Sequence, residues 1–291
     1  MLSLSYAECG QKSFVFSWKK ADDADMKSET IERRLTISKL DQLSPMDAAG
    51  ILDGSSDLTG LLVWPASEAL AHYIFWQTTH KHEQQTKASS LFSRQPQQRV
   101  LELGAGAGLV GLVAAFHALE VVLTDGNEET LSLLEANLAN NKQHIFTEED
   151  EEDKQDGGNE KKKRNARCKL LRWGEEGLEQ WRSEGETCHS FDVILGADLV
   201  YDEELLAPLF QTVNGLLARH ENAFFLLMYS IRGQRLDQRV LEEAEKEGFH
   251  YELFEYPKKL LLQLSAQQER KQEENEEEAN NIRCILFKRK G

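Results

Sequence analysis

The sequence has few cysteines and no close pair of them. The four are Cys9, Cys168, Cys188 and Cys284, scattered along 291 residues. Without a C-x-x-C pair we expect neither a disulfide framework nor a thiolate zinc site, and a reducing compartment is the default. The histidines contain no H-E-x-x-H, and His80 and His82 flank one lysine in a polar stretch that we expect to be solvated. The sequence therefore predicts no metal site.

Long apolar runs are also absent, and so is a surplus of positive charge. No run is long enough to span a membrane, and the first twenty residues include Glu8 and lack the apolar stretch of a secretory signal. We therefore expect a soluble, cytoplasmic protein that does not bind membranes. Asp and Glu number 50 against 34 Lys and Arg, a formal charge of −16. Such a field repels nucleic acid and attracts a lysine-rich protein surface.

Two stretches are too polar to bury apolar surface. Residues 148–164 read EEDEEDKQDGGNEKKKR, and residues 265–281 read SAQQERKQEENEEEANN. We expect disordered acidic insertions over residues 144–166 and 265–281. The acidic block is compatible with a docking arm, and KKKR (161–164) with a nuclear localisation signal that gives the protein a nuclear pool as well. A long surface loop is the simpler interpretation of the first stretch.

Elsewhere, strand-like and helix-like segments alternate. The expected strands are Arg99–Leu103, Glu120–Thr124, Cys168–Trp173, Phe191–Leu195, Ala223–Tyr229, His250–Tyr256 and Arg283–Lys288. The expected helices are Leu109–Ala118, Asn127–Asn141, Glu203–Arg219 and Arg235–Glu247, with another that begins at Pro65. This alternation predicts an α/β fold with a doubly wound, mostly parallel seven-stranded sheet over residues 59–291. Residues 1–58, with β-like runs at 13–18 and 34–37, read as an appended hairpin.

A glycine-rich turn follows the first strand of this sheet. Glu102 to Gly108 read ELGAGAG, and Asp125 lies 21 residues after Gly104, at the end of the next strand. Glycines there allow a tight turn and a close backbone approach to a ligand beside a helix N-terminus. A carboxylate in the place of Asp125 can accept hydrogen bonds from both hydroxyls of a ribose. The pair predicts a nucleoside ligand.

The identity of the nucleoside is a separate question. Gly106, Gly108 and Gly111 satisfy the dinucleotide spacing G-x-G-x-x-G, which would imply a hydride-transfer enzyme. However, counting from Gly104, the first glycine after the strand, the third position of that fingerprint falls on Leu109. An E-x-G-x-G-x-G turn suits an amino-acid-bearing nucleoside better than a pyrophosphate. Too little chain also remains for the substrate domain of a dehydrogenase.

Several short motifs in order resemble a known family. ELGAGAGLVG (102–111), LTDGN (123–127), RWG (172–174) and ADLVY (197–201) look like the successive motifs of the seven-strand lysine methyltransferases called methyltransferase family 16. TGLLVWP (59–65) is similar to that family's segment before the first strand. The resemblance covers about residues 59–232. It implies a Rossmann-like class I fold, S-adenosyl-L-methionine as cofactor and a protein lysine as substrate.

The resemblance also implies roles for individual residues. Those implied for the cofactor are Trp64, Glu102, Gly104, Gly106, Gly108, Asp125, Trp173 and Ala197, and those implied for methyl transfer are Asp198 and Tyr201. Glu102 and the glycines would hold the methionine part and Asp125 the ribose. Trp173 would lie against the adenine, and Trp64 would cover the cofactor. The structural alternatives are core tryptophans, an N-cap acid at Asp198 and a packed aromatic at Tyr201.

Methyl transfer from a sulfonium needs no metal, so the protein has to align the reactants and exclude water. We expect Tyr201 and Trp64 to form aromatic walls around the amine, and Asp198 to bind and orient it rather than to deprotonate it. Tyr229 and Arg232 are either substrate contacts or an ordinary strand-to-loop transition. A small-molecule, nucleic-acid or other side-chain methyltransferase and a non-catalytic cofactor-binding module stay open. The fourth strand lacks the N-P-P-Y motif of base methylases.

Overall fold

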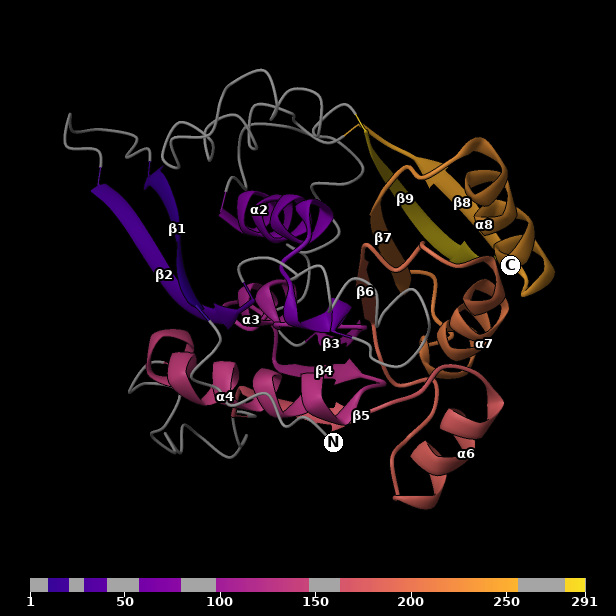
Figure 1. Cartoon of the computed structure of the whole chain (residues 1–291), viewed down its shortest axis with the longest axis horizontal. Coiled ribbons are helices and arrows are strands. Elements are labelled where there is room, and N and C mark those ends of the chain that lie inside the picture. The colour runs from indigo at the N-terminus through magenta and orange to yellow at the C-terminus, as the bar shows by residue number, and fades with distance from the viewer. Residues whose placement is uncertain are drawn as a thin grey trace, which may run out of the picture.

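The computed structural model describes residues 10–20, 29–40, 58–79, 98–146, 163–255 and 281–290. Within these ranges a seven-stranded sheet crosses the molecule (Figure 1). Its strands are β3 (Arg99–Leu103), β4 (Glu120–Asp125), β5 (Asn165–Leu170), β6 (Val193–Ala197), β7 (Phe224–Ser230), β8 (Phe249–Leu253) and β9 (Ile282–Arg289). The order is β5-β4-β3-β6-β7-β9-β8, and only β9 runs antiparallel to its neighbours. The predicted mostly parallel seven-stranded sheet is confirmed.

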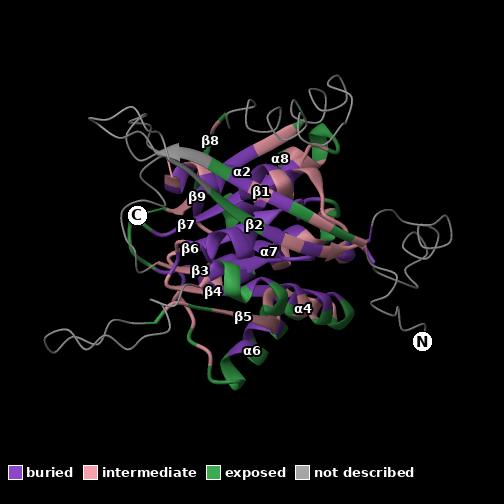
Figure 2. Cartoon of the chain, turned by 90° about the vertical axis from the view of Figure 1, so that its left-hand side faces the viewer, coloured by how far each residue is buried: buried purple, intermediate pink, exposed green. Residues whose placement is uncertain are grey.

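Helices cover both faces of the sheet. One face packs against α2 (Pro65–Thr79), α3 (Leu109–Ala114) and α4 (Glu128–Ile145), and the other against α6 (Glu175–Ser183), α7 (Leu206–Leu216) and α8 (Gln234–Lys246). Strand β7 shows why both faces are apolar. Its Met228 packs in the core between the sheet and helices α2–α4, and its Leu227 packs in the core between the sheet and helices α6–α8. This is expected for a strand buried on both sides. Figure 2 shows the central strands β3, β4, β6 and β7 as a buried layer, whereas the edge strands β5 and β8 are partly exposed. None of the described helices is long and apolar enough to cross a membrane.

The expected N-terminal hairpin is present and is longer than predicted. Strands β1 (Gly10–Lys20) and β2 (Glu29–Lys39) pair antiparallel in a separate two-stranded sheet. The side chains of Asn137 and Asn141 on α4 exchange hydrogen bonds of 2.8–3.0 Å with the backbone of Ser38 and Thr36 on β2. The hairpin therefore lies against the helical layer that contains α2 and α4.

The predicted bounds of the first insertion, residues 144–166, were too wide at both ends. His144 and buried Ile145 complete helix α4, so the helix runs four residues beyond the predicted Asn141. At the other end, β5 begins at Asn165 and stops at Leu170, three residues ahead of the predicted strand in both cases. The strand is earlier because Asn165 pairs with Glu120 in the parallel register of β4 and β5.

The basic cluster KKKR is partly built into the fold. Arg164 donates hydrogen bonds to the carbonyl oxygens of Phe116 at 2.8 Å and Ile145 at 3.4 Å, where α3 and α4 end. A guanidinium suits these positions because the last carbonyls of a helix lack partners in the helix. Lys161 and Lys162 lie outside the described residues, as do residues 265–280 of the second insertion. Asn281 forms the turn before β9.

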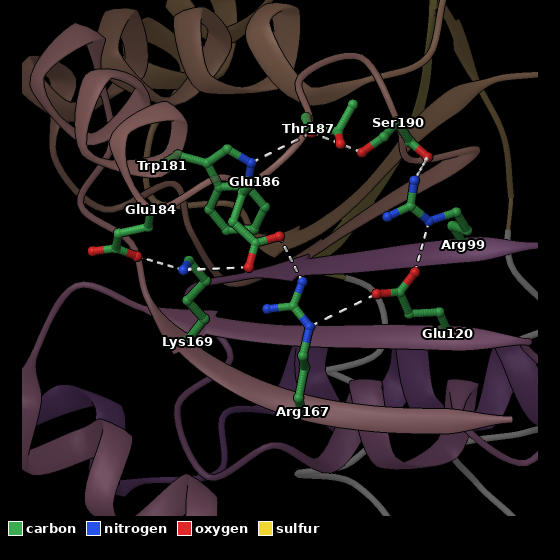
Figure 3. Close-up of polar contacts among 9 residues, drawn as sticks. All are labelled: Arg99, Glu120, Arg167, Lys169, Trp181, Glu184, Glu186, Thr187 and Ser190. Carbon is green, nitrogen blue, oxygen red and sulfur yellow. Dashed lines mark hydrogen bonds and ion pairs between the residues drawn. The ribbon is translucent and has the colours of Figure 1, made fainter.

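A network of six charged side chains joins β3, β4 and β5 to the segment that follows α6 (Figure 3). This charge network consists of Arg99, Glu120, Arg167, Lys169, Glu184 and Glu186. Arg99 Nε lies 2.7 Å from Glu120, and Arg167 Nη2 lies 2.8 Å from Glu186. Lys169 also lies over the ring of Trp181 at 5.2 Å. Helix α6 was not predicted, because Leu178 and Trp181 are the only large side chains it buries.

Candidate active site

The glycine turn after β3 has a backbone that only glycine adopts easily. Gly104, Gly106 and Gly108 have φ angles of +55°, +54° and +88°, in the left-handed region that favours glycine. Space is also restricted. A Cβ on Gly106 would lie 2.9 Å from the carbonyl oxygen of Gly60, and one on Gly104 would lie 2.6 Å from Leu199 Cδ2. The turn therefore needs glycine for its backbone shape and for close approach to two other segments.

Asp125 ends β4 and faces this turn. Its Oδ2 accepts a hydrogen bond from the Gly106 N–H and its Oδ1 one from the Asn127 N–H, both at 3.0 Å. The side chain is half-buried. An ionised carboxylate offers about four acceptor positions, so these two bonds are compatible with a ribose hydroxyl as a further donor. Asp125 thus joins the turn to the carboxyl end of β4.

Glu102 points to a different place from Asp125. It is 2 % exposed, and its Oε2 accepts a hydrogen bond from the Gly111 N–H at 2.8 Å, in the first turn of α3. Burial raises the pKa of this carboxyl to about 8, against the Gly111 hydrogen bond and with the negative charge of Asp125 acting in the same upward direction. In the structure, the Glu102 side chain therefore bonds to the first turn of α3. Contact with the methionine part of a cofactor stays a prediction.

The other residues implied for the cofactor lie around the same edge of the sheet. Trp173, in the loop after β5, is partly buried, and its Cζ2 lies 3.3 Å from the position of a Cβ on Gly104. Ala197 is the last residue of β6 and is buried. Trp64 donates a hydrogen bond from Nε1 to the Thr59 carbonyl oxygen at 3.0 Å. Thr59 begins the 3-10 turn η2 (Thr59–Leu61), whose Gly60 lies on the glycine turn.

Asp198 joins three segments at the carboxyl ends of β6 and β7. Its side chain is 1 % exposed. Its Oδ2 accepts a hydrogen bond from the Ala66 N–H at 3.0 Å, and its Oδ1 one from the Ser230 N–H at 2.7 Å. Ala66 lies in the first turn of α2, so Asp198 caps that helix from a distant part of the chain. Its φ of +55° is unusual for a residue other than glycine and is typical of functional sites.

Two aromatic rings and one cation lie beside Asp198. The Cζ atom of Arg232 is 5.4 Å from the ring centroid of Trp64 and 6.0 Å from that of Tyr201. Arg232 Nη2 is 4.0 Å from Asp198 Oδ1, a long ion pair. The Tyr201 side chain is 46 % exposed, so one face of the cluster is open to solvent. We call Trp64, Asp198, Tyr201 and Arg232 the acceptor cluster.

The two residues proposed near the end of β7 lie apart. Arg232 belongs to the acceptor cluster. Tyr229 instead packs in the core on the α6–α8 face, and its hydroxyl donates a hydrogen bond to Asp237 of α8 at 2.5 Å. Tyr229 lies within β7, whereas Arg232 follows two residues after its end, so the alternation of side chains along the strand applies to Tyr229 alone. Tyr229 is therefore a core residue.

Sequence reasoning missed two residues that shape the site. Leu199 fills the space between the ends of β3 and β6, because its Cδ atoms lie 2.6–2.7 Å from the positions of Cβ atoms on Gly104 and Gly196. Gly60 leaves room for both Thr130 and the glycine turn. Both residues lie inside motifs already noted, at 59–65 and 197–201. The signal available in the sequence was a glycine or a large apolar residue within each motif.

This strand order, with a glycine turn after β3 and an acid ending β4, defines a nucleoside-binding α/β protein of the methyltransferase type. The family model described as lysine methyltransferase matches residues 50–247, which is more than half of the chain. The chain belongs to the lysine methyltransferase family. The cofactor of this class is S-adenosyl-L-methionine. The residues present fit it, because the turn has no side chains in the way and a half-buried carboxylate faces it.

Individual relatives match over shorter stretches. A calmodulin-lysine N-methyltransferase of Arabidopsis thaliana is 29 % identical over 202 residues, covering 68 % of this chain and 54 % of that protein. A protein N-lysine methyltransferase, METTL21A, of Danio rerio is 35 % identical over 149 residues, covering 51 % and 56 %. The chain thus spans about half the length of these curated relatives. A TehB-like SAM-dependent methyltransferase structure from Corynebacterium glutamicum aligns over 85 % of this chain at 14 % identity, with a TM-score of 0.43.

Proposed function

We propose that this protein transfers a methyl group from S-adenosyl-L-methionine to the side-chain amine of a lysine in another protein. The observation that carries the proposal is the position of the acceptor cluster beside the glycine turn. Leu199, the residue after Asp198, packs against Gly104, and the turn that holds Trp64 packs against Gly106. Membership of the lysine methyltransferase family supports the same reaction, as do the relatives named for calmodulin-lysine and protein-lysine methylation.

The proposed cofactor site combines the glycine turn with the side chains of Asp125, Glu102 and Trp173. Asp125 would accept the ribose hydroxyls, the glycine turn would hold the methionine part with Glu102 beneath it, and Trp173 would lie against the adenine. When bound, S-adenosyl-L-methionine supplies a methyl group on a sulfonium: the amine lone pair forms the new N–C bond while the S–C electron pair returns to sulfur. The protein has to align the amine and exclude water.

The acceptor cluster suits an amine that must enter as a cation and react as a neutral base. Presenting a neutral lysine at neutral pH costs roughly 4 kcal/mol, since its reference pKa is about 10.4. The rings of Trp64 and Tyr201 attract a cation and also desolvate it, and desolvation favours the neutral amine. Asp198 would orient the amine rather than remove its proton, because its two oxygens already hold the Ala66 and Ser230 N–H groups.

Two measurements test the proposal. Titration calorimetry with S-adenosyl-L-methionine should show binding, whereas NAD binding would indicate a dehydrogenase and no binding a non-catalytic module. The protein is then incubated with cofactor labelled in the methyl group and a cell extract, and the labelled residue is identified by mass spectrometry. A labelled lysine supports the proposal. Label on histidine, a base or a small molecule would replace it with the corresponding methyltransferase.

A further inference from the structure

Arg232 is the one cation that the described structure places within the acceptor cluster. It follows β7 in the short connection to α8, and its side chain is 34 % exposed. The guanidinium lies against Trp64 and Tyr201 at 5.4 and 6.0 Å from the ring centroids. A site built only to bind an ammonium group would combine aromatic faces with acids. Here a permanent cation already lies among the rings, so the cluster differs from a simple ammonium cage.

The charges around this cation leave Asp198 as its partner. The other described acids on the surrounding elements are engaged elsewhere or exposed: Glu68 of α2 pairs with Lys12, Asp202 accepts the Glu204 N–H, Glu203 pairs with Arg235 and Arg239, Asp237 pairs with Arg283, and Glu204 is exposed. The charges of Asp198 and Arg232 therefore offset each other inside the cluster, whereas Asp202 and Glu204 carry their charges on the exposed surface outside it.

We propose that Arg232 disfavours the protonated form of the substrate lysine, so that the amine beside Trp64 and Tyr201 is presented neutral. This inference rests on the proposed function. A guanidinium keeps its charge throughout the working pH range. At about 6 Å and an effective dielectric of about 20, a unit positive charge lowers the pKa of an amine by about two units. Asp198 alone would raise the pKa of the substrate amine. Arg232 lowers this pKa, which is the direction that the reaction needs.

The experiment measures kcat for methyl transfer at saturating cofactor and saturating acceptor, from about pH 6.5 to about pH 10, because kcat reports ionisations in the enzyme–substrate complex. The acceptor is the purified protein identified by the labelled-extract experiment. The wild type is compared with Arg232→Gln, Arg232→Lys and Arg235→Gln. Arg235 is a matched control, since it is 84 % exposed at the start of α8, pairs with Glu203 and loses the same charge. The dissociation constant for S-adenosyl-L-methionine, measured for each variant, reports on the fold and the cofactor site.

We expect Arg232→Gln to lower kcat about tenfold or more at neutral pH and to move the rising limb of the kcat profile up by about one to two pH units. The loss should disappear at alkaline pH, where the bound lysine is neutral in the variant as well. Arg232→Lys should return the rising limb to nearly its wild-type pH, and Arg235→Gln should leave the limb at the wild-type pH. Cofactor affinity should stay at the wild-type value.

Two results would overturn the inference while the proposed function stands. An equal fractional loss at every pH would mean that Arg232 only holds the rings in place. A faster Arg232→Gln variant would mean that the guanidinium obstructs the site. If the wild type labels no acceptor, the proposed function itself fails, and the inference fails with it.

Discussion

The two ends of strand β4 carry carboxylates with different surroundings. At the amino end, Glu120 belongs to the charge network, where Arg99 Nε lies at 2.7 Å and Arg167 Nε at 3.7 Å (Figure 3). At the carboxyl end, Asp125 is held by the backbone N–H groups of Gly106 and Asn127. Glu120 has cations as partners, whereas Asp125 accepts hydrogen bonds from neutral backbone amides, one of them in the glycine turn.

The same contrast separates the charge network from the acceptor cluster. The network pairs arginine and lysine with glutamates along partly exposed strands, and such pairs contribute little to stability individually. Asp198 in the acceptor cluster is almost fully buried, lies 4.0 Å from Arg232 Nη2 and has a strained backbone conformation. Because ligands of doubly wound sheets bind at the carboxyl ends of strands, we infer that the cluster, and not the network, takes part in the proposed methyl transfer.

The largest effect is expected from Asp198→Asn. Asparagine tolerates a positive φ, but its amide nitrogen would face either the Ala66 or the Ser230 N–H. We expect methylation to fall at least about 100-fold and the free energy of unfolding to drop by roughly 2–4 kcal/mol. Denaturant unfolding and a methylation assay measure both. Ala would be a poorer test, because it loses both hydrogen bonds and suits the φ of +55° badly. Near-normal methylation would remove Asp198 from the site.

Glu102→Gln tests a buried acid that accepts its hydrogen bond from the backbone N–H of Gly111. A folded-state pKa of about 8 against 4.5 means that the folded protein holds a proton that the unfolded chain releases, so stability falls as pH rises from about 4.5 to about 8. We expect the variant to lose this dependence of stability on pH. Its free energy of unfolding should therefore rise by roughly 3–5 kcal/mol relative to that of the wild type over that interval. Unfolding at several pH values measures it. Parallel pH curves for the two proteins would contradict the assigned protonation of Glu102.

The sequence was sufficient to predict the features that depend on residues close together in the chain, such as the bounds of β3 and the start of β4. β3 has the predicted bounds because an apolar run ends at a glycine, and β4 begins at the predicted Glu120. The long-range contacts could not be predicted. Asp198 bonds to Ala66, 132 residues away, and to Ser230, 32 residues away. Helix α6 was missed because its apolar face is short, and the start of β5 because its register is set by β4 rather than by its own composition.

Asp125→Asn should affect the ligand more than the fold. The amide would present a donor to one of the two N–H groups and would weaken its acceptance of ribose hydroxyls. Hydrogen bonds to a charged group contribute about 1.5–3 kcal/mol each, so the dissociation constant for S-adenosyl-L-methionine should rise about 10- to 100-fold. Titration calorimetry measures this, with the thermal midpoint recorded alongside. An unchanged constant in a folded variant would place the ribose elsewhere.

The smallest effect is expected from Glu120→Gln, which is the matched control for Asp125→Asn. It makes the same carboxylate-to-amide change at the other end of β4. Since the pairs with Arg99 and Arg167 are partly exposed, we expect a loss of about 1 kcal/mol or less in unfolding free energy, smaller still in about 1 M salt. Cofactor affinity and methylation should stay at wild-type values. If both variants weakened cofactor binding equally, the two ends of the strand would not have separate roles, because a general disturbance of β4 would account for both results.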